Sequence, residues 1–218
     1  MFIHFKTNTL RLGIVILALN ANVILASDLK ISVVDEKEQP LPWAVVYVKQ
    51  NKPLSQKKQI VVDQVDKEFT PYVTAIQKGN AINFPNNDNI RHQVYSFSKA
   101  KQFEIPLYSG NPIRPVTFDT TGVIAMACNI HDWMSAYVYV VESDKFIVTN
   151  EQGEGVISGL NTGEYQVLAW HPKLKGESVD TTQSINIGAL DTQIKFALEK
   201  KTLLKSWRAP KNNKRRGY

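Results

Sequence analysis

The chain has a single cysteine and no segment that predicts a long amphipathic helix. One thiol, Cys128, among 218 residues excludes an intramolecular disulfide framework, a cysteine-rich zinc site and a dinuclear centre that needs two thiolates. The sequence also lacks a phosphate-cradling glycine loop, a carboxylate pair spaced for acid–base catalysis and an HExxH zinc motif. These absences argue against an enzyme, so we predict a protein without catalytic residues.

The composition is that of an ordinary globular protein. Hydrophobic residues make up 43% of the chain and charged residues 21%, which is neither a disordered nor a collagen-like composition. The 11 glycines and 10 prolines are spread among short apolar segments, which favours a fold with many turns. The length suits one large or two small domains.

The first 27 residues have the pattern of an export signal. Lys6 and Arg11 give a positive start, Leu12–Leu19 forms an apolar run, and Ala26 offers a small residue for cleavage. Asparagines interrupt the run before it reaches the roughly 20 residues that span a bilayer, so an uncleaved membrane anchor is the weaker alternative. We therefore predict a cleaved signal peptide over 1–27 and a periplasmic protein.

The net charge of +6 comes mainly from the C-terminal end of the chain. Residues 199–218 hold eight cations and one acid, whereas the body between Asp28 and Leu198 holds 16 cations and 19 acids. A nucleic-acid partner is not predicted, because the body is slightly acidic and carries no recognised binding motif. The basic tail over 201–218 is either simply solvated or able to touch an anionic membrane surface or an acidic partner.

Short strand patterns dominate the first two thirds of the chain after the signal. Apolar alternation or β-branched runs bounded by Gly, Pro, Asn and Asp predict strands over Leu29–Val34, Ala44–Val48, Ile60–Val65, Tyr72–Ile76, Ala81–Phe84, Gln93–Ser98, Pro115–Phe118, Gly122–Ala127 and Ala136–Val141. Lys99–Arg114, with two prolines and a glycine, is expected to be a long connection that crosses between sheets. Short strands without helical patterns between them predict an antiparallel sandwich or barrel.

Further strands follow after Val141. They are predicted over Phe146–Thr149, Gly155–Ser158, Glu164–Trp170, Ser184–Ile187 and Gln193–Leu198, with glycine-bearing hairpin turns among them. The stretch Asn150–Pro172 resembles the small transthyretin-like sandwich that is also seen as the regulatory domain of carboxypeptidases, which implies a packing or partner module. Residues 29–48 also resemble the opening strands of such modules, so their pairing with the first or the second domain stays open at this point.

The informative chemical motif is Cys128-Asn129-Ile130-His131-Asp132-Trp133-Met134. It spaces a thiol, an imidazole and a thioether as C-x2-H-x2-M, and the soft thioether suits copper far better than zinc. His92, just before a predicted strand, offers the second imidazole. Two histidines and one cysteine in a plane with a distant methionine form the ligand set of a blue-copper site. We therefore predict one type 1 copper ion held by His92, Cys128, His131 and Met134.

Less specific interpretations of the same residues are a buried structural thiol, a loop histidine and a core methionine, or a zinc or empty site. Their combination argues against these, because the predicted mature chain has three histidines, of which two fall in the motifs. The remaining one, His171 in Trp170-His171-Pro172, is expected to be a loop residue of the second domain.

At this point the sequence resembles the cupredoxins, with a Cys-His-Met spacing nearer to amicyanin than to plastocyanin. A closer resemblance is to exported cupredoxin-like proteins labelled as methylamine-utilisation proteins. It covers roughly residues 30–172 and depends on Asp63-Gln64-Val65, Phe69-x-Pro71, Phe84-x-Asn86-x-Asp88, Arg91–Ser98, Phe103-Glu104, Leu107-Tyr108-x-Gly110 and Cys128–Met134. The resemblance implies that His92, Cys128, His131 and Met134 are copper ligands. Gln93 departs from the asparagine that many cupredoxins carry after the first histidine, which leaves the tuning of the site open.

The predicted organisation is thus all-β: a signal peptide over 1–27, a cupredoxin-like Greek-key barrel or sandwich over 28–141, a small transthyretin-like sandwich over 142–200 and a basic, flexible tail over 201–218. The leading function is single-electron transfer in the periplasm with a redox protein such as a cytochrome or a dehydrogenase. The alternative is a periplasmic copper-handling protein that binds or delivers the metal without shuttling electrons. A structural module with a stabilising metal is a third interpretation.

Overall fold

The computed structural model describes residues 26–51, 53, 58–112, 114–176 and 181–201. Within these ranges the chain forms seventeen strands and no α-helix, which confirms the all-β class. None of the described residues forms a helix with the length and hydropathy that a membrane crossing needs. Residues 1–25 of the predicted signal over 1–27, and the basic tail beyond Lys201, lie outside the described residues.

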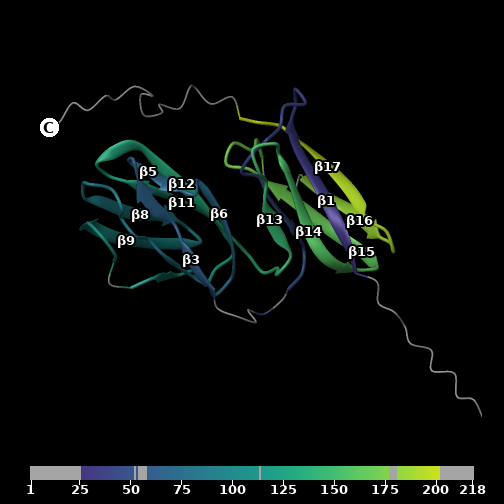
Figure 1. Ribbon diagram of the computed structural model, residues 1–218, viewed down its shortest axis with the longest axis horizontal. Coiled ribbons are helices and arrows are strands. Elements are labelled where there is room, and N and C mark those ends of the chain that lie inside the picture. Colours follow the sequence, from purple (N-terminus) through teal and green to yellow (C-terminus); the bar gives the residue numbers. More distant parts are fainter. Residues whose placement is uncertain (1–25, 52, 54–57, 113, 177–180, 202–218) are drawn as a thin grey trace, which may run out of the picture.

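Two groups of strands lie side by side (Figure 1). In one group a five-stranded sheet has the order β6-β12-β11-β8-β9, and a three-stranded sheet has the order β10-β7-β3. These strands are β3 (Gln59–Val61), β6 (Val73–Gln77), β7 (Ala81–Asn83), β8 (His92–Ser98), β9 (Lys101–Tyr108), β10 (Val116–Thr117), β11 (Gly122–Cys128) and β12 (His131–Val141). A separate hairpin joins β4 (Asp63–Val65) to β5 (Glu68–Thr70).

The core of this first group comes from strands with one buried face. Residues that alternate along β8, β11 and β12 point inward, among them Val94, Ile124, Met126 and Val138, and pack with Phe84 and Phe118. Cys128 and Met134 belong to the same buried cluster. Burial of this apolar face stabilises the group through the hydrophobic effect and places both sulfur-bearing side chains inside the protein.

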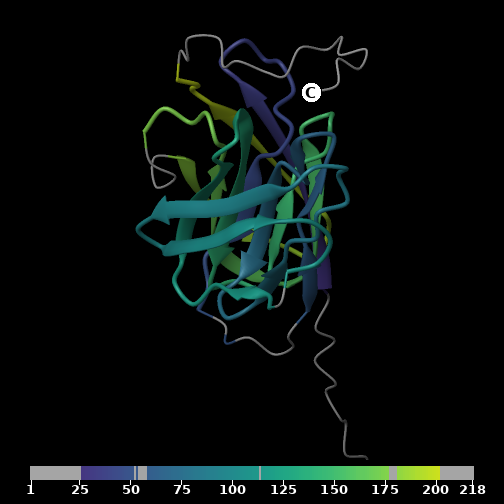
Figure 2. The same cartoon turned by 90° about the vertical axis from the view of Figure 1, so that its left-hand side faces the viewer.

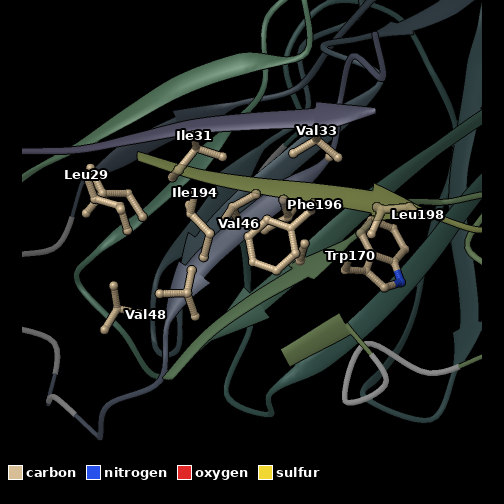
Figure 3. Packing of buried hydrophobic residues seen from close by; sticks show 14 of the residues in the cluster. Leu29, Ile31, Val33, Val46, Val48, Trp170, Ile194, Phe196 and Leu198 are labelled. Atoms are coloured by element: carbon tan, nitrogen blue, oxygen red, sulfur yellow. The ribbon is translucent and has the colours of Figure 1, made fainter. Parts of the chain in front are cut away.

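The second group contains a three-stranded sheet, β14-β1-β17, and a four-stranded sheet, β13-β2-β15-β16. Its strands are β1 (Ala26–Asp35), β2 (Val45–Val48), β13 (Phe146–Val148), β14 (Glu154–Asn161), β15 (Gly163–Trp170), β16 (Thr182–Ile187) and β17 (Thr192–Leu198). Figure 3 shows Ile194 and Phe196 of β17 near Val46 and Val48 of β2 in the buried space between the two sheets.

The N-terminal strands belong to this second group. β1 pairs antiparallel with β14 and parallel with β17, and β2 pairs with β13 and β15. This resolves the open question about residues 29–48 and differs from the expected boundary at residue 28. The physical reason is that Leu29, Ile31 and Val33 of β1 continue the apolar face formed by Ile194 and Phe196 of β17. Without β1 between them, β14 and β17 would each expose an unpaired edge.

A chain of aromatic contacts joins the two groups. Ring centroids are 5.7 Å apart for Tyr72 and Tyr137, 5.9 Å for Tyr137 and Trp170, and 5.1 Å for Tyr139 and Trp170. Tyr137 and Tyr139 are on β12 and Trp170 is on β15, so the outer face of the five-stranded sheet is the surface that the second group covers (Figures 1 and 2).

The expected long connection over Lys99–Arg114 is wrong in part. Its residues Lys101–Tyr108 form β9, which pairs antiparallel with β8 in the same sheet, so they do not cross between sheets there. β9 is the edge of its sheet, and an edge strand tolerates Pro106 because one side of it needs no hydrogen bonds. The mixed polarity of an edge strand also hides the alternation that predicts strands.

Candidate metal centre

Cys128 and His131 flank the turn between two paired strands. Cys128 ends β11 and His131 begins β12, with Asn129 and Ile130 between them. The strands extend to both residues, and Met134 lies within β12. The pairing shifts between Ala127 and Cys128, and such an irregularity re-aims side chains at the end of a strand.

His92 approaches from the neighbouring strand. It is the first residue of β8, which pairs with β11, and its side chain is fully buried. His92 and Val94 share the buried face of β8, because alternate residues of a strand point to the same side. The pairing of β8 with β9 shifts between these two residues, where the extra residue lies on β9 between Ile105 and Tyr108. Bulges of this kind are frequent next to functional sites.

The structure brings the thiol and both imidazoles together. Cys128 Sγ lies 3.8 Å from His92 Nδ1 and 3.9 Å from His131 Nδ1, and the donor atoms of the three residues all lie within 4.8 Å of one another. Donors that share one ion at about 2.0–2.3 Å can be at most roughly 4.6 Å apart, a limit that both sulfur–nitrogen distances satisfy. No other such group occurs among the described residues.

Met134 completes the predicted set of residues in the same part of the core. Its side chain is 1% exposed and Cys128 is 3% exposed, and both belong to one buried cluster. His131 is partly exposed, and its ring lies against that of Trp133 with centroids 5.2 Å apart. A thiolate, two imidazoles and a thioether in a largely dry pocket are a donor set that fits copper.

Asp88 fixes the orientation of the His92 ring. Its Oδ2 atom lies 2.9 Å from His92 Nε2 and accepts a hydrogen bond of 2.8 Å from the backbone N–H of Lys67. Burial opposes ionisation of Asp88, but the hydrogen bonds from His92, Lys67 and Asn89 together lower its pKa below the usual value. An ionised carboxylate accepts a hydrogen bond from Nε2, which orients the ring so that Nδ1 faces Cys128.

The second imidazole is kept neutral. Burial, followed by the electrostatic effects of His92 and Lys67, lowers the pKa of His131. A neutral imidazole is the form that binds metals, so the environment of His131 favours metal binding over protonation.

Further polar groups support the loop that precedes His92. Burial raises the pKa of Tyr108 to about 12, and its hydroxyl donates to the carbonyl of Phe84 and accepts from Gln64 Nε2. Asn86 Nδ2 donates to the carbonyls of Ile90 and Tyr108. These bonds hold the segment before His92 against the end of β9.

Gln93 does not point into the site. Its Nε2 donates to Glu104 Oε1 on β9 at 2.6 Å, so the side chain reaches across to the neighbouring strand on the face opposite to His92. His171, the remaining histidine of the predicted mature chain, lies in the second group and is 4% exposed. It does not take part in the cluster of His92, Cys128 and His131.

The sequence prediction did not include Asp88, Lys67, Gln64 or Tyr108 in the site. A signal for Asp88 was present, because an acid four residues before a ligand histidine in a turn-rich loop is placed to bond the second ring nitrogen. Nothing in the local sequence indicates Lys67, since its contact arises from a distant hairpin.

We expect Asp88→Asn to weaken copper binding about 10–100-fold, the usual effect of losing an outer partner of a ligand histidine. An amide carries no charge to hold the Nε2 proton, so the His92 tautomer and ring orientation are less well fixed. A competition titration with a copper chelator measures the effect. Asp132→Asn, the same change at an exposed position within the ligand stretch, serves as the control and is expected to stay within threefold of the parent.

Comparison with known proteins gives likeness in solved structures alone. No family model matches the chain, and no curated protein does. Similar solved structures include a copper-containing nitrite reductase from Thermus scotoductus SA-01, at 22% identity and a TM-score of 0.37 over 43% of this chain and 25% of that one. The chain thus spans about a quarter of that reductase.

Two smaller proteins are similar over nearly their whole length. A purple cupredoxin from Nitrosopumilus maritimus is 19% identical with a TM-score of 0.34, over 38% of this chain and 99% of its own. A reduced amicyanin variant is 18% identical with a TM-score of 0.35, over 44% of this chain and 97% of its own. These likenesses are too weak to carry an argument, so the interpretation of the site depends on its own geometry.

Proposed function

We propose that the protein is an exported, mononuclear copper protein that passes single electrons between redox partners. The observation that carries the proposal is the position of Cys128 Sγ, 3.8 and 3.9 Å from the Nδ1 atoms of two histidines. His92, Cys128, His131 and Met134 would hold the ion, as the resemblance to cupredoxins also implies. Copper bound by such a set supplies a centre that alternates between Cu(I) and Cu(II).

The chain's own residues provide what electron transfer needs. Cys128 and Met134 are held by paired strands, and Asp88 holds His92, so the donor positions are fixed before an ion arrives. A fixed set of donors limits rearrangement between oxidation states and favours rapid electron exchange. His131 is the one partly exposed member of the set, so its ring edge is the shortest route between the buried donors and a partner.

The remaining predicted properties belong to this proposal. The protein acts in the periplasm after loss of residues 1–27, has no catalytic residues, and exchanges electrons with a cytochrome or a dehydrogenase. The copper domain is the group that contains β3–β12, and the small sandwich contains β13–β17 with β1 and β2. The basic tail over 201–218 supplies a contact to an acidic partner or an anionic membrane surface.

Copper loading of the mature protein tests the proposal. We expect one equivalent of Cu(II) per chain, an intense red-region thiolate-to-copper absorption band and a small copper hyperfine splitting in electron paramagnetic resonance. The band should bleach on one-electron reduction and return on oxidation without loss of metal. A colourless copper complex contradicts a type 1 site, and rapid release of the metal to an acceptor protein would favour copper handling instead.

A further inference from the structure

The hairpin formed by β4 and β5 lies against the loop that carries Asp88. Its tip is the pair Asp66 and Lys67, both with positive φ, at 53° and 61°. Two such residues between paired strands form the tight turn that suits the twist of a hairpin, where Asn-Gly and Asp-Gly are preferred. A lysine at the second position is therefore unfavourable, since a non-glycine residue in this region is strained by about 1 kcal/mol or more.

The hairpin and the loop are joined by several hydrogen bonds. The backbone N–H and Nε2 of Gln64 both donate to the carbonyl of Pro85 at 3.1 Å. Asn87 donates from its backbone N–H to the carbonyl of Gln64 at 3.1 Å and from Nδ2 to Asp63 Oδ2 at 2.7 Å. β4 thus runs beside residues 85–87 and fixes the distance between the hairpin tip and Asp88.

One carboxylate oxygen connects the tip to the metal centre. Asp88 Oδ2 accepts from the Lys67 N–H at 2.8 Å and lies 2.9 Å from His92 Nε2. The Asp88 side chain is 10% exposed and the His92 side chain is fully buried, so water competes little for either bond. If the turn at Lys67 shifts, Asp88 loses a donor and its hold on the His92 ring weakens.

We propose that Lys67 is a positioning residue of the centre: its backbone N–H holds Asp88 against His92. This inference rests on the proposed function. The contact belongs to the backbone and depends on the positive φ of Lys67, so a substitution acts on the contact by favouring or opposing that conformation.

Two substitutions at Lys67 act on the turn in opposite directions. Lys67→Gly favours the turn, whereas Lys67→Val opposes positive φ because its side chain is β-branched. Both remove the charge of the side chain, so the charge cannot account for a difference between them. We expect Lys67→Val, and not Lys67→Gly, to change the copper hyperfine splitting and to weaken copper affinity about tenfold.

A readout on metal-free protein distinguishes this inference from the proposed function. The Nε2–H proton of His92, held by Asp88, should exchange slowly with water in the parent and in Lys67→Gly, and at least tenfold faster in Lys67→Val. Lys67→Ala, which strains the turn less than valine, should lie between them and remains informative if the valine variant does not fold. Lys195→Gln removes an exposed lysine on β17 and controls for loss of a positive charge, with no expected change in the exchange rate.

Equal exchange rates in the glycine and valine variants would overturn the positioning role. If the parent protein shows no thiolate-to-copper band, the proposed function fails, whereas the exchange of the His92 proton still decides whether the hairpin positions that ring.

Discussion

Cys128→Ser is expected to abolish the red-region band and the small hyperfine splitting of the copper-loaded protein. The band arises from charge transfer between a thiolate and copper, and a serine hydroxyl supplies neither the soft donor nor the anionic ligand. Cys128 is the chain's single cysteine, so no other thiolate replaces it. Absorption and resonance spectra of the parent and the variant, loaded under the same conditions, measure the effect.

The substitution is a demanding test because it changes the shape of the core very little. The side chain changes by a single atom, from sulfur to the smaller oxygen, and the 3% exposed Cys128 side chain lies at the end of β11 beside two imidazoles able to hydrogen-bond a hydroxyl. The metal-free variant should therefore fold as the parent does. Met126→Leu, a conservative change on the same buried face of β11, is the control and should keep the band. Survival of the band in Cys128→Ser would show that the thiol is not a ligand.

Residues close together in the sequence made the centre partly predictable. The spacing of Cys128, His131 and Met134 places one donor on each side of a turn and a third inside the next strand. His92 begins the strand beside Cys128. Ligand types restrict the choice further, because a single thiol has few uses beside two histidines and a methionine. These features depend on the residue types of a short stretch and on the pairing of two strands that are adjacent in the sequence, and sequence patterns indicate both well.

The support around the centre was not predictable in the same way. Asp88, Lys67 and Gln64 meet through hydrogen bonds between a hairpin and a loop about twenty residues apart in the printed sequence, and none of these residue types is specific to such a role. The pair of positive φ angles at Asp66 and Lys67 is equally hidden, since neither residue is a glycine. Tertiary contacts decide these features.

The strands were mostly predictable, whereas their partners were less so. Period-two alternation along β1 predicts a strand with one buried face, but its parallel pairing with β17, more than 150 residues away in the sequence, leaves no local signal. β9 was missed because an edge strand buries little and carries charges that blunt aggregation. Pairing thus determines where residues 26–48 belong, and composition does not.

His171 should make the stability of the protein fall as the pH drops from about 7 to 4. Burial, opposed by a hydrogen bond to the Pro42 carbonyl and reinforced by Lys173 and Lys200, lowers its pKa from 6.5 to about 4. Its Nδ1 accepts the backbone N–H of Lys173 at 3.1 Å, a bond that a protonated ring cannot make. In this window the unfolded chain binds a proton that the folded protein excludes, so acidification favours unfolding.

The size of the effect follows from the difference between the two pKa values. From 6.5 to about 4 at about 1.4 kcal/mol per unit, protonation lowers the free energy of unfolding by about 3 kcal/mol, all of it lost between pH 7 and 4. Urea unfolding of metal-free protein at several pH values measures this slope. Other groups, His131 among them, titrate in the same range, so the contribution of His171 is the difference from a variant that cannot titrate.

His171→Asn is that variant, because an asparagine oxygen accepts an N–H two residues ahead in the same kind of turn and carries no titratable proton. We expect the parent to be more stable than His171→Asn near pH 7, where the ring also donates to Pro42, and to lose that advantage as the pH approaches 4. Parallel pH profiles for the two proteins would show that His171 is already accessible to protons in the folded state. That result would contradict the burial of this side chain, which is 4% exposed.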